Sequence, residues 1–294
     1  MNPTFYVIGA YRSGTTTLYR TMRQHPEVFL PLEKEPMFFA IDENPDASPV
    51  LRSRSVADRA EYESLYAPCR PDQLPGDISP EYLRNPYVAG HLASVVPDAR
   101  IVAVLRNPIE RAWSDFLLHR RDGNEPCETL EAALAEQAER QSGEDHRAGH
   151  YIDTGMYAQQ LRRYFDHFPA EQIHVVLFED LRTDFAATMA AIFEHVGVDP
   201  TVTVTEESAI NASGVPRNPV VAAVLKARGR LRPYVSRSVL ERVRPLWDRV
   251  LSTQLDRPTF TPTDRALLTD IYRDEIADLA TLLDRDLSAW TDPG

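Results

Sequence analysis

The sequence predicts an α/β protein: a P-loop-like parallel β-sheet flanked by helices, followed by a helical C-terminal region. Short apolar runs alternate with segments of helical periodicity up to about residue 200, a pattern typical of parallel sheets with crossover helices. The run Ile101–Leu105 is apolar at every position, as expected for a strand that is buried on both faces. From Val220 onward the periodicity is helical.

The N-terminal part begins with a strand, a glycine-rich turn and a helix. The apolar run Phe5–Ile8 ends at Gly9 and predicts a buried strand. A helix is expected over Thr15–Gln24, with Pro26 just beyond it as a stop signal. Residues 41–55 are rich in Pro, Asp and Ser and predict a loop. Further helices are expected over Val56–Tyr66 and Asn85–Val95.

Pro108 follows the strand Ile101–Leu105 and suits the first turn of a helix that runs to about Arg121. The other expected elements are helices at Leu130–Gln141, Tyr157–Phe168, Phe185–Val196 and Thr263–Trp290, a strand at Ile173–Phe178 and a loose polar segment at 142–150. No repeat or linker divides the chain. We therefore expect one domain over 1–294, in which 217–290 is the mostly helical C-terminal part.

Composition excludes several classes of protein. The net charge of −12 disfavours nucleic acid and other polyanions as partners. Two cysteines, Cys69 and Cys127, are too few for a disulfide framework and do not have zinc-site spacing. No stretch of about 18 apolar residues occurs, so no membrane span is expected. The N-terminus lacks the features of a signal peptide, so a cytoplasmic location is expected.

The segment Gly9–Leu18 predicts an anion-binding loop. A strand ends, a turn containing Gly14 follows, and a helix begins, which directs backbone N–H groups and a positive helix end to one point. Arg12 adds a fork of donors suited to phosphate or sulfate. Hydroxyl donors come from Ser13, Thr15, Thr16 and Thr17.

Two alternatives compete with this interpretation. The spacing of Gly9 and Gly14 matches a nucleotide P-loop, but Thr15 stands where an NTPase or kinase has lysine. The strand Ile101–Leu105 is followed by Arg106 and not by an acidic residue for Mg²⁺. A P-loop kinase or NTPase is therefore one alternative, and a plain connecting turn is the other.

These residues resemble the PAPS-dependent sulfotransferase family (PAPS is 3′-phosphoadenosine 5′-phosphosulfate), especially bacterial relatives of the heparan sulfate and other carbohydrate sulfotransferases. The resemblance runs through nearly the whole chain, in the family's order. It is carried by Arg12–Leu18, Lys34–Phe39, Asp77–Tyr82, Val104–Ser114, Gly155–Tyr157 and Leu287–Trp290.

The resemblance implies a second anion site for the 3′-phosphate of PAPS. Arg106 and Ser114 would supply a charged fork and a hydroxyl there, and the end of a buried strand is where open α/β sheets bind ligands. An ion pair with Glu110 is the alternative for Arg106. Tyr157 would contact the adenine region, or belong to the core. Ser213, Gly214 and Arg217 match a late cofactor loop of the family only loosely.

The resemblance also implies a mechanism: in-line transfer of the sulfuryl group without a metal, leaving PAP as product. Glu35 is the expected general base. Arg12 is expected to stabilise charge on the 5′-phosphosulfate, and Lys34 to neutralise the sulfonate or keep Glu35 ionised. The alternative for 33–35 is a solvated charged turn. Besides the sulfotransferase and the P-loop kinase or NTPase, a third hypothesis is a non-catalytic protein that binds PAP.

The acceptor is expected to offer a hydroxyl, or less commonly an amine, on a carbohydrate, a lipid-linked glycan or a secondary metabolite. The segment 217–249 contains nine Lys or Arg against two acidic residues. It is interpreted as a lid over PAPS, a dock for an anionic acceptor, a contact with an anionic lipid surface or a solvated helical face. The sequence does not indicate the oligomeric state.

Overall fold

The computed structural model describes residues 2–136, 150–207, 215–217, 221, 255–256 and 258–292. The chain divides into two compact units. The first unit comprises residues 1–108, 153–209 and 272–290, and the second comprises 109–152, 210–271 and 291–294. The expectation of one domain over 1–294 stays a prediction.

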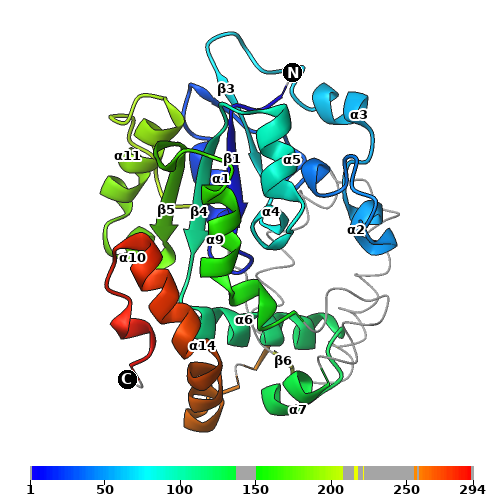
Figure 1. Ribbon diagram of the computed structural model, residues 1–294, viewed down its shortest axis with the longest axis vertical. Coiled ribbons are helices and arrows are strands. Elements are labelled where there is room, and N and C mark those ends of the chain that lie inside the picture. The colour runs from blue at the N-terminus through cyan, green and yellow to red at the C-terminus, as the bar shows by residue number, and fades with distance from the viewer. Residues whose placement is uncertain are drawn as a thin grey trace. The chain divides into compact units, whose positions relative to one another are not determined.

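The first unit contains a five-stranded parallel sheet in the order β2-β3-β1-β4-β5 (Figure 1). The strands are β1 (Phe5–Gly9), β2 (Val28–Phe29), β3 (Leu74–Ile78), β4 (Arg100–Leu105) and β5 (Ile173–Leu177). β1 lies at the centre, between β3 and β4. The predicted parallel α/β sheet is therefore confirmed.

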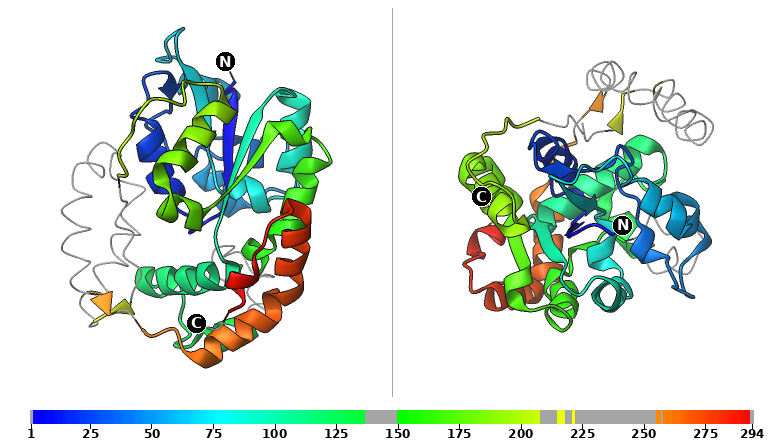
Figure 2. Two further views of the ribbon diagram at one scale, coloured as in Figure 1. Left: turned by 90° about the vertical axis from the view of Figure 1, so that its left-hand side faces the viewer. Right: turned by 90° about the horizontal axis from the view of Figure 1, so that it is seen from above.

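Helices cover both faces of this sheet (Figures 1 and 2). On one face lie α1 (Thr15–Met22) and α11 (Phe185–Val196), and on the other lie α5 (Val88–Val95) and α9 (Tyr157–Phe165). The remaining helical elements of this unit are η1 (Phe38–Ala40), α2 (Pro49–Arg54), α3 (Arg59–Ser64), α4 (Glu81–Arg84), η2 (Asp153–Gly155), η3 (Ala170–Gln172), α10 (Phe178–Thr183) and η5 (Ser288–Trp290).

The core follows from the alternation of side chains along the strands. Phe5 and Val7 of β1 pack with Val102 of β4 against α1 and α11. Alternate residues point to the other face, where the ring of Tyr6 meets Phe39 edge-on at 5.6 Å. Each fully buried large apolar side chain contributes about 1.5–3 kcal/mol to folding. This burial on both faces fixes the strand ends that carry the loops described below.

The second unit contains α6 (Pro108–Asp122, whose first residue closes the first unit), α7 (Leu130–Ala135) and the antiparallel pair β6 (Val215–Pro216) and β7 (Leu255–Asp256). It also holds the start of α14 (Pro262–Leu283), a helix that continues into the first unit. Within this unit the indole of Trp113 stacks on Phe260 with ring centroids 5.1 Å apart. The expected helical C-terminal region is confirmed by α14.

Several predicted boundaries were wrong. Residues 49–54 form helix α2 inside the predicted loop 41–55, because Ser48 Oγ accepts a hydrogen bond from Leu51 N at 3.2 Å and Pro49 begins the helix. The strand β2 was missed because it has only two residues, and β3 because it contains Pro75. The long C-terminal helix ends at Leu283, before a separate turn at 288–290.

Other differences are smaller. The predicted helix 85–95 begins at Val88, and a short helix, α4, precedes it. Phe178 begins helix α10 and does not end the preceding strand. The part of the predicted helix 130–141 beyond residue 136, and nearly all of 142–150 and 217–249, lie outside the described residues. No helix within the described ranges is long and apolar enough to span a membrane.

Candidate functional site

The loop between β1 and α1 has the geometry of an anion-binding loop. Gly14 is the N-cap of α1 and has a φ of 86°, in the left-handed region that favours glycine. A Cβ on Gly14 would lie 2.8 Å from the ring of Phe178, closer than atoms can approach. Glycine is thus required twice, by conformation and by space. The loop brings the positive end of α1 to the carboxyl edge of the sheet.

The hydroxyl of Ser13 is a buried polar group in this loop that a ligand could satisfy. Its side chain is fully buried, and its hydroxyl has no hydrogen-bond partner in the part of the chain that the structure describes. A buried hydroxyl without a partner costs roughly 1–3 kcal/mol. An anion bound to the loop would remove this cost by accepting the hydroxyl proton.

Arg106 contacts the loop between β1 and α1 from the neighbouring strand. It follows β4, and its Nη1 donates a hydrogen bond to the carbonyl oxygen of Arg12 at 3.3 Å. Its guanidinium carbon lies 5.3 Å from the centre of the Phe178 ring, a distance typical of a cation–π contact. Two of the predicted donor-site arginines are therefore brought together at the carboxyl ends of β1 and β4.

A cavity of about 210 Å³ opens beside the loop. Its walls include Gly14 and Thr17 from the loop and α1, and Phe178 and Phe185 from α10 and α11. Leu18, Leu181, Arg182, Met189 and Glu206 complete the lining. A cavity that combines aromatic and aliphatic side chains with the charged residues Arg182 and Glu206 can hold a flat ring that carries polar groups.

Sequence analysis missed the cavity residues Phe178, Leu181 and Arg182. Phe178 was assigned to the preceding strand, and the others were given no role. A usable signal was present, because Phe178 directly follows a buried strand whose carboxyl end lies at the ligand-binding edge.

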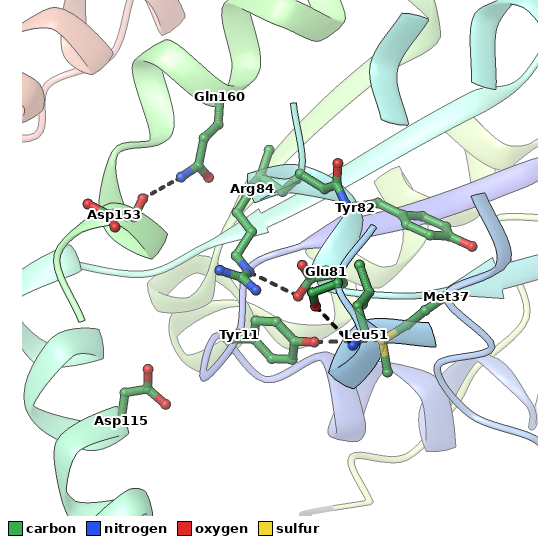
Figure 3. A network of polar contacts seen from close by, with 12 residues as sticks. Tyr11, Met37, Leu51, Glu81, Tyr82, Arg84, Asp115, Asp153 and Gln160 are labelled. Carbon is green, nitrogen blue, oxygen red and sulfur yellow. Dashed lines mark hydrogen bonds and ion pairs between the residues drawn. The ribbon is translucent and has the colours of Figure 1, made fainter. Parts of the chain in front are cut away.

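Tyr11, in the loop between β1 and α1, contacts the segment that follows Lys34 and Glu35. The Tyr11 hydroxyl contacts Met37 Sδ at 3.9 Å (Figure 3). Burial raises the pKa of the Tyr11 phenol well above its usual value, and the negative charges of Glu81 and Glu35 add to this effect. Tyr11 therefore remains a neutral hydroxyl between the loop and the two carboxylates.

Lys34 and Glu35 form an ion pair with each other, and their side chains are 18% and 24% exposed. The backbone turns sharply here, since Glu35 has a φ of 61° and Met37 a φ of 52°. The alternative of a solvated charged turn therefore does not describe these two side chains, which are partly buried. A carboxylate that is reachable from solvent and charge-paired with a lysine is chemically suited to accept a proton.

Asp77 is fully buried and is connected to this segment through Ser79, whose hydroxyl also accepts a hydrogen bond from Met37 N. Its carboxylate accepts hydrogen bonds from Ser79 Oγ at 2.6 Å and from the hydroxyls of Tyr62 and Tyr82 at 2.8 Å each. Burial raises the pKa of Asp77 to about 6, because desolvation outweighs these three hydrogen bonds. The negative charge of Glu35 raises this pKa further.

Other polar pairs surround the same region. Arg84 Nε donates to Glu81 Oε2 at 2.9 Å, and Gln160 Nε2 donates to the carbonyl oxygen of Asp153 at 2.6 Å (Figure 3). Glu81 is itself buried, whereas the Arg84 side chain is 24% exposed. A buried carboxylate near Tyr11 is therefore paired with a partly exposed guanidinium.

The remaining predicted site residues are not tested by this geometry. Tyr157 is fully buried in α9, and Ser114 is buried on α6 of the second unit. Arg217 is exposed, and its Nε binds Asp256 Oδ1 at 2.7 Å. Ser213 and Gly214 lie outside the described residues. Across the described ranges, no group of three or more His, Cys, Asp and Glu side chains is arranged to hold a metal ion.

The chain matches the model of the sulfotransferase family over residues 3–201. The matched range includes the loop between β1 and α1, the Lys34–Glu35 segment, Asp77 and Arg106. The protein therefore belongs to the sulfotransferase family.

A sulfotransferase from Alicyclobacillus acidocaldarius has the same fold. Its crystal structure matches 99% of this chain and 100% of its own, with 26% identity and a TM-score of 0.77. The mouse heparan sulfate glucosamine 3-O-sulfotransferase 3B1 is 25% identical in an alignment of 259 positions that covers 83% of this chain and 60% of the mouse protein. The mouse bifunctional heparan sulfate N-deacetylase/N-sulfotransferase 4 is 26% identical in an alignment of 210 positions that covers 67% of this chain and 22% of that protein. The chain thus spans about 60% or less of these curated relatives.

Proposed function

We propose that this protein transfers the sulfuryl group of PAPS to a hydroxyl of a carbohydrate, lipid-linked or secondary-metabolite acceptor, with an amine as the lesser alternative. The observation that carries the donor assignment is the buried Ser13 hydroxyl without a partner in the described residues, in the loop whose Arg12 carbonyl oxygen accepts a hydrogen bond from Arg106. The residue types fit a phosphosulfate, because a helix N-terminus, a hydroxyl and arginine side chains are the groups that bind such anions.

In this proposal the 5′-phosphosulfate lies on the loop formed by Arg12, Ser13, Gly14 and the threonines at 15–17. The adenine occupies the cavity next to Phe178, and Arg106 binds the 3′-phosphate together with Ser114. The family membership of the chain supports PAPS as the donor. Tyr157, Ser213, Gly214 and Arg217 are proposed to complete the donor site. No metal is part of the proposal.

Glu35 is proposed as the general base. It takes the proton of the acceptor hydroxyl as that oxygen forms a bond to sulfur. The bond between sulfur and the bridging oxygen of the phosphosulfate breaks, and PAP leaves with the electron pair. Arg12 stabilises the charge that develops on the bridging oxygen, and Lys34 neutralises the sulfonate. A base in this role contributes ~10²–10⁴-fold to the rate.

The names of the relatives suggest the first acceptors to test. Both mouse proteins act, by their names, on heparan sulfate, one at a hydroxyl and one at an amine. The net charge of −12 opposes a polyanion of that kind. A neutral glucosamine oligosaccharide and a heparan sulfate oligosaccharide are therefore suitable paired probes, and PAP released from PAPS measures turnover with each.

Thermal unfolding tests the donor site without an acceptor. A ligand at ~100 times its dissociation constant stabilises the folded state by about 2.7 kcal/mol. The melting temperature should rise with PAP and stay unchanged with ATP and Mg²⁺. A rise only with ATP and Mg²⁺ would favour a kinase and overturn the proposal.

The Glu35→Gln variant tests the general base. Its turnover should fall at least tenfold while PAP binding stays near that of the unmodified protein. Glu33→Gln is the matched control, since it removes the same charge two residues earlier. If both variants turn over like the unmodified protein, Glu35 is not the base. If Glu35→Gln loses PAP binding as well, its role lies in the donor site.

A further inference from the structure

The buried carboxylate of Asp77 lies at one end of two hydrogen-bond relays that lead to the segment after Glu35. Ser79 Oγ donates to Asp77 Oδ1 at 2.6 Å and accepts from the backbone N–H of Met37 at 3.1 Å. Tyr82 OH donates to Asp77 Oδ2 at 2.8 Å and accepts from the backbone N–H of Phe39 at 3.3 Å.

The direction of both relays is fixed by chemistry. A backbone N–H can only donate, so each hydroxyl accepts from the backbone and must give its own proton to the carboxylate. An ionised carboxylate strengthens such a chain by polarising each hydroxyl. Tyr62 OH also donates to Asp77, but no hydrogen bond between its side chain and the segment 35–39 occurs in the described residues.

The segment that these relays hold is strained. Glu35 and Met37 both have left-handed backbone conformations, with φ of 61° and 52°. Such conformations are unfavourable for residues with a Cβ and persist where the surroundings enforce them. The carbonyl oxygen of Pro36 accepts a hydrogen bond from Val56 N at 2.8 Å. Three backbone groups directly after Glu35 are therefore anchored, two of them through Asp77.

Burial of the Asp77 carboxylate costs free energy. Asp77 is fully buried and forms no ion pair within the described part of the chain, whereas a buried carboxylate normally has a cationic partner. Hydrophobic residues would stabilise this part of the core more simply. A carboxylate is suited to a different task, because it can accept several O–H groups at once and fix their orientation.

We propose that Asp77 is a positioning residue for the general base: through Ser79 and Tyr82 it fixes the backbone at Met37 and Phe39 and thereby sets the orientation of Glu35. This inference rests on the proposed role of Glu35. Asp77 itself contacts neither donor nor acceptor in this proposal, so its loss affects turnover and not the binding of PAP.

The structure provides a matched pair of variants for the test. Tyr62→Phe and Tyr82→Phe each remove one phenol hydroxyl that donates to the same oxygen of Asp77 at 2.8 Å. Only Tyr82→Phe also releases a backbone N–H of the anchored segment. Turnover is measured as PAP released from PAPS with the two oligosaccharide probes, and with water as acceptor if neither reacts.

Tyr82→Phe and Ser79→Ala should lower kcat at least tenfold and leave the Kd of PAP within about twofold. Tyr62→Phe should keep kcat within about threefold, and Ser79→Thr, which keeps the hydroxyl, should recover activity. Amide hydrogen exchange adds a readout that needs no acceptor. Exchange at Met37 should accelerate in Ser79→Ala, and exchange at Phe39 in Tyr82→Phe, but neither in Tyr62→Phe.

A double-mutant cycle separates this proposal from the assignment of the base. If Ser79 acts through Glu35, Ser79→Ala should have little further effect in the Glu35→Gln background. An equal additional loss in that background would overturn the positioning role. Equal losses of kcat in Tyr62→Phe and Tyr82→Phe would overturn it as well, since they would indicate a general effect on the core. Full turnover of Glu35→Gln alone would instead refute the base assignment.

Discussion

The Nη1 of Arg106 donates a hydrogen bond of 3.3 Å to the carbonyl oxygen of Arg12, 94 residues earlier in the chain. This contact joins the loop after β1 to the end of β4, its neighbour in the sheet. The two arginines come from separate sequence motifs, and the parallel pairing of β1 and β4 places both at one edge. The Arg106 side chain thereby fixes the backbone of the loop at Arg12.

Removing Arg106 should weaken donor binding. Hydrogen bonds to charged groups contribute about 1.5–3 kcal/mol, so Arg106→Ala should raise the Kd of PAP about 10–100-fold. Arg106→Lys should recover only part of the affinity, because lysine lacks the fork of donors. Isothermal titration calorimetry measures both. Arg100→Ala, an exposed arginine at the opposite end of β4, is the control and should bind PAP normally. Equal affinity of the Arg106 and Arg100 variants would exclude Arg106 from the donor site.

Replacement of Gly14 should damage both stability and binding. Gly14→Ala places a Cβ in a left-handed residue and 2.8 Å from the Phe178 ring. Gly197 also has a left-handed backbone, with φ of 91°, but its Cβ would lie at an ordinary 3.8 Å from Leu74. Gly197→Ala should therefore cost only the conformational term, about 1–2 kcal/mol. Gly14→Ala should cost about 1–3 kcal/mol more, from overpacking.

Urea denaturation with and without PAP measures this pair of variants. Only Gly14→Ala should lose the stabilisation that PAP provides. If the two glycine variants respond to PAP alike, the loop geometry at Gly14 is not needed for the ligand.

Asp77 should make the stability of the protein depend on pH. Its pKa is about 6 in the folded protein, above its usual value of 3.8. The folded state therefore favours the protonated form. The stabilisation from this protonation is complete below about pH 4 and is lost as the pH rises through 6. The free-energy advantage of the unmodified protein over Asp77→Asn should fall by about 2 kcal/mol between pH 4.5 and 7.5.

Chemical denaturation of both proteins at the two pH values measures that difference, and the asparagine variant cancels the contributions of the other titrating groups. A difference that stays constant with pH would mean that Asp77 titrates at its usual value. A difference that grows with pH would mean that the folded protein favours the ionised carboxylate.

Much of the sheet was predictable because local patterns specified it. Phe5–Ile8 and Ile101–Leu105 are continuous apolar runs, and both form buried strands with little change of boundary. The strand β3 was missed because Pro75 and Gly76 weaken any local preference for extended structure. β3 forms because it pairs with β1, and Gly76 is needed there because a Cβ would clash with the Phe5 ring. No sequence pattern carried that information.

The candidate site likewise has features that the local sequence specifies and features that depend on tertiary packing. The sequence by itself determined the strand–loop–helix element, since a strand, Gly14 and a helix start are encoded in the eleven consecutive residues 5–15. It also pointed to Lys34, Glu35 and Arg106 as chemically capable groups. Only the tertiary structure decided that Arg106 meets Arg12 and that Phe178 borders the loop. Likewise, only the fold showed that Asp77 is connected through Ser79 and Tyr82 to the backbone that follows Glu35. The physical reason is that these contacts depend on the order of the strands and on burial, which arise when distant segments pack together.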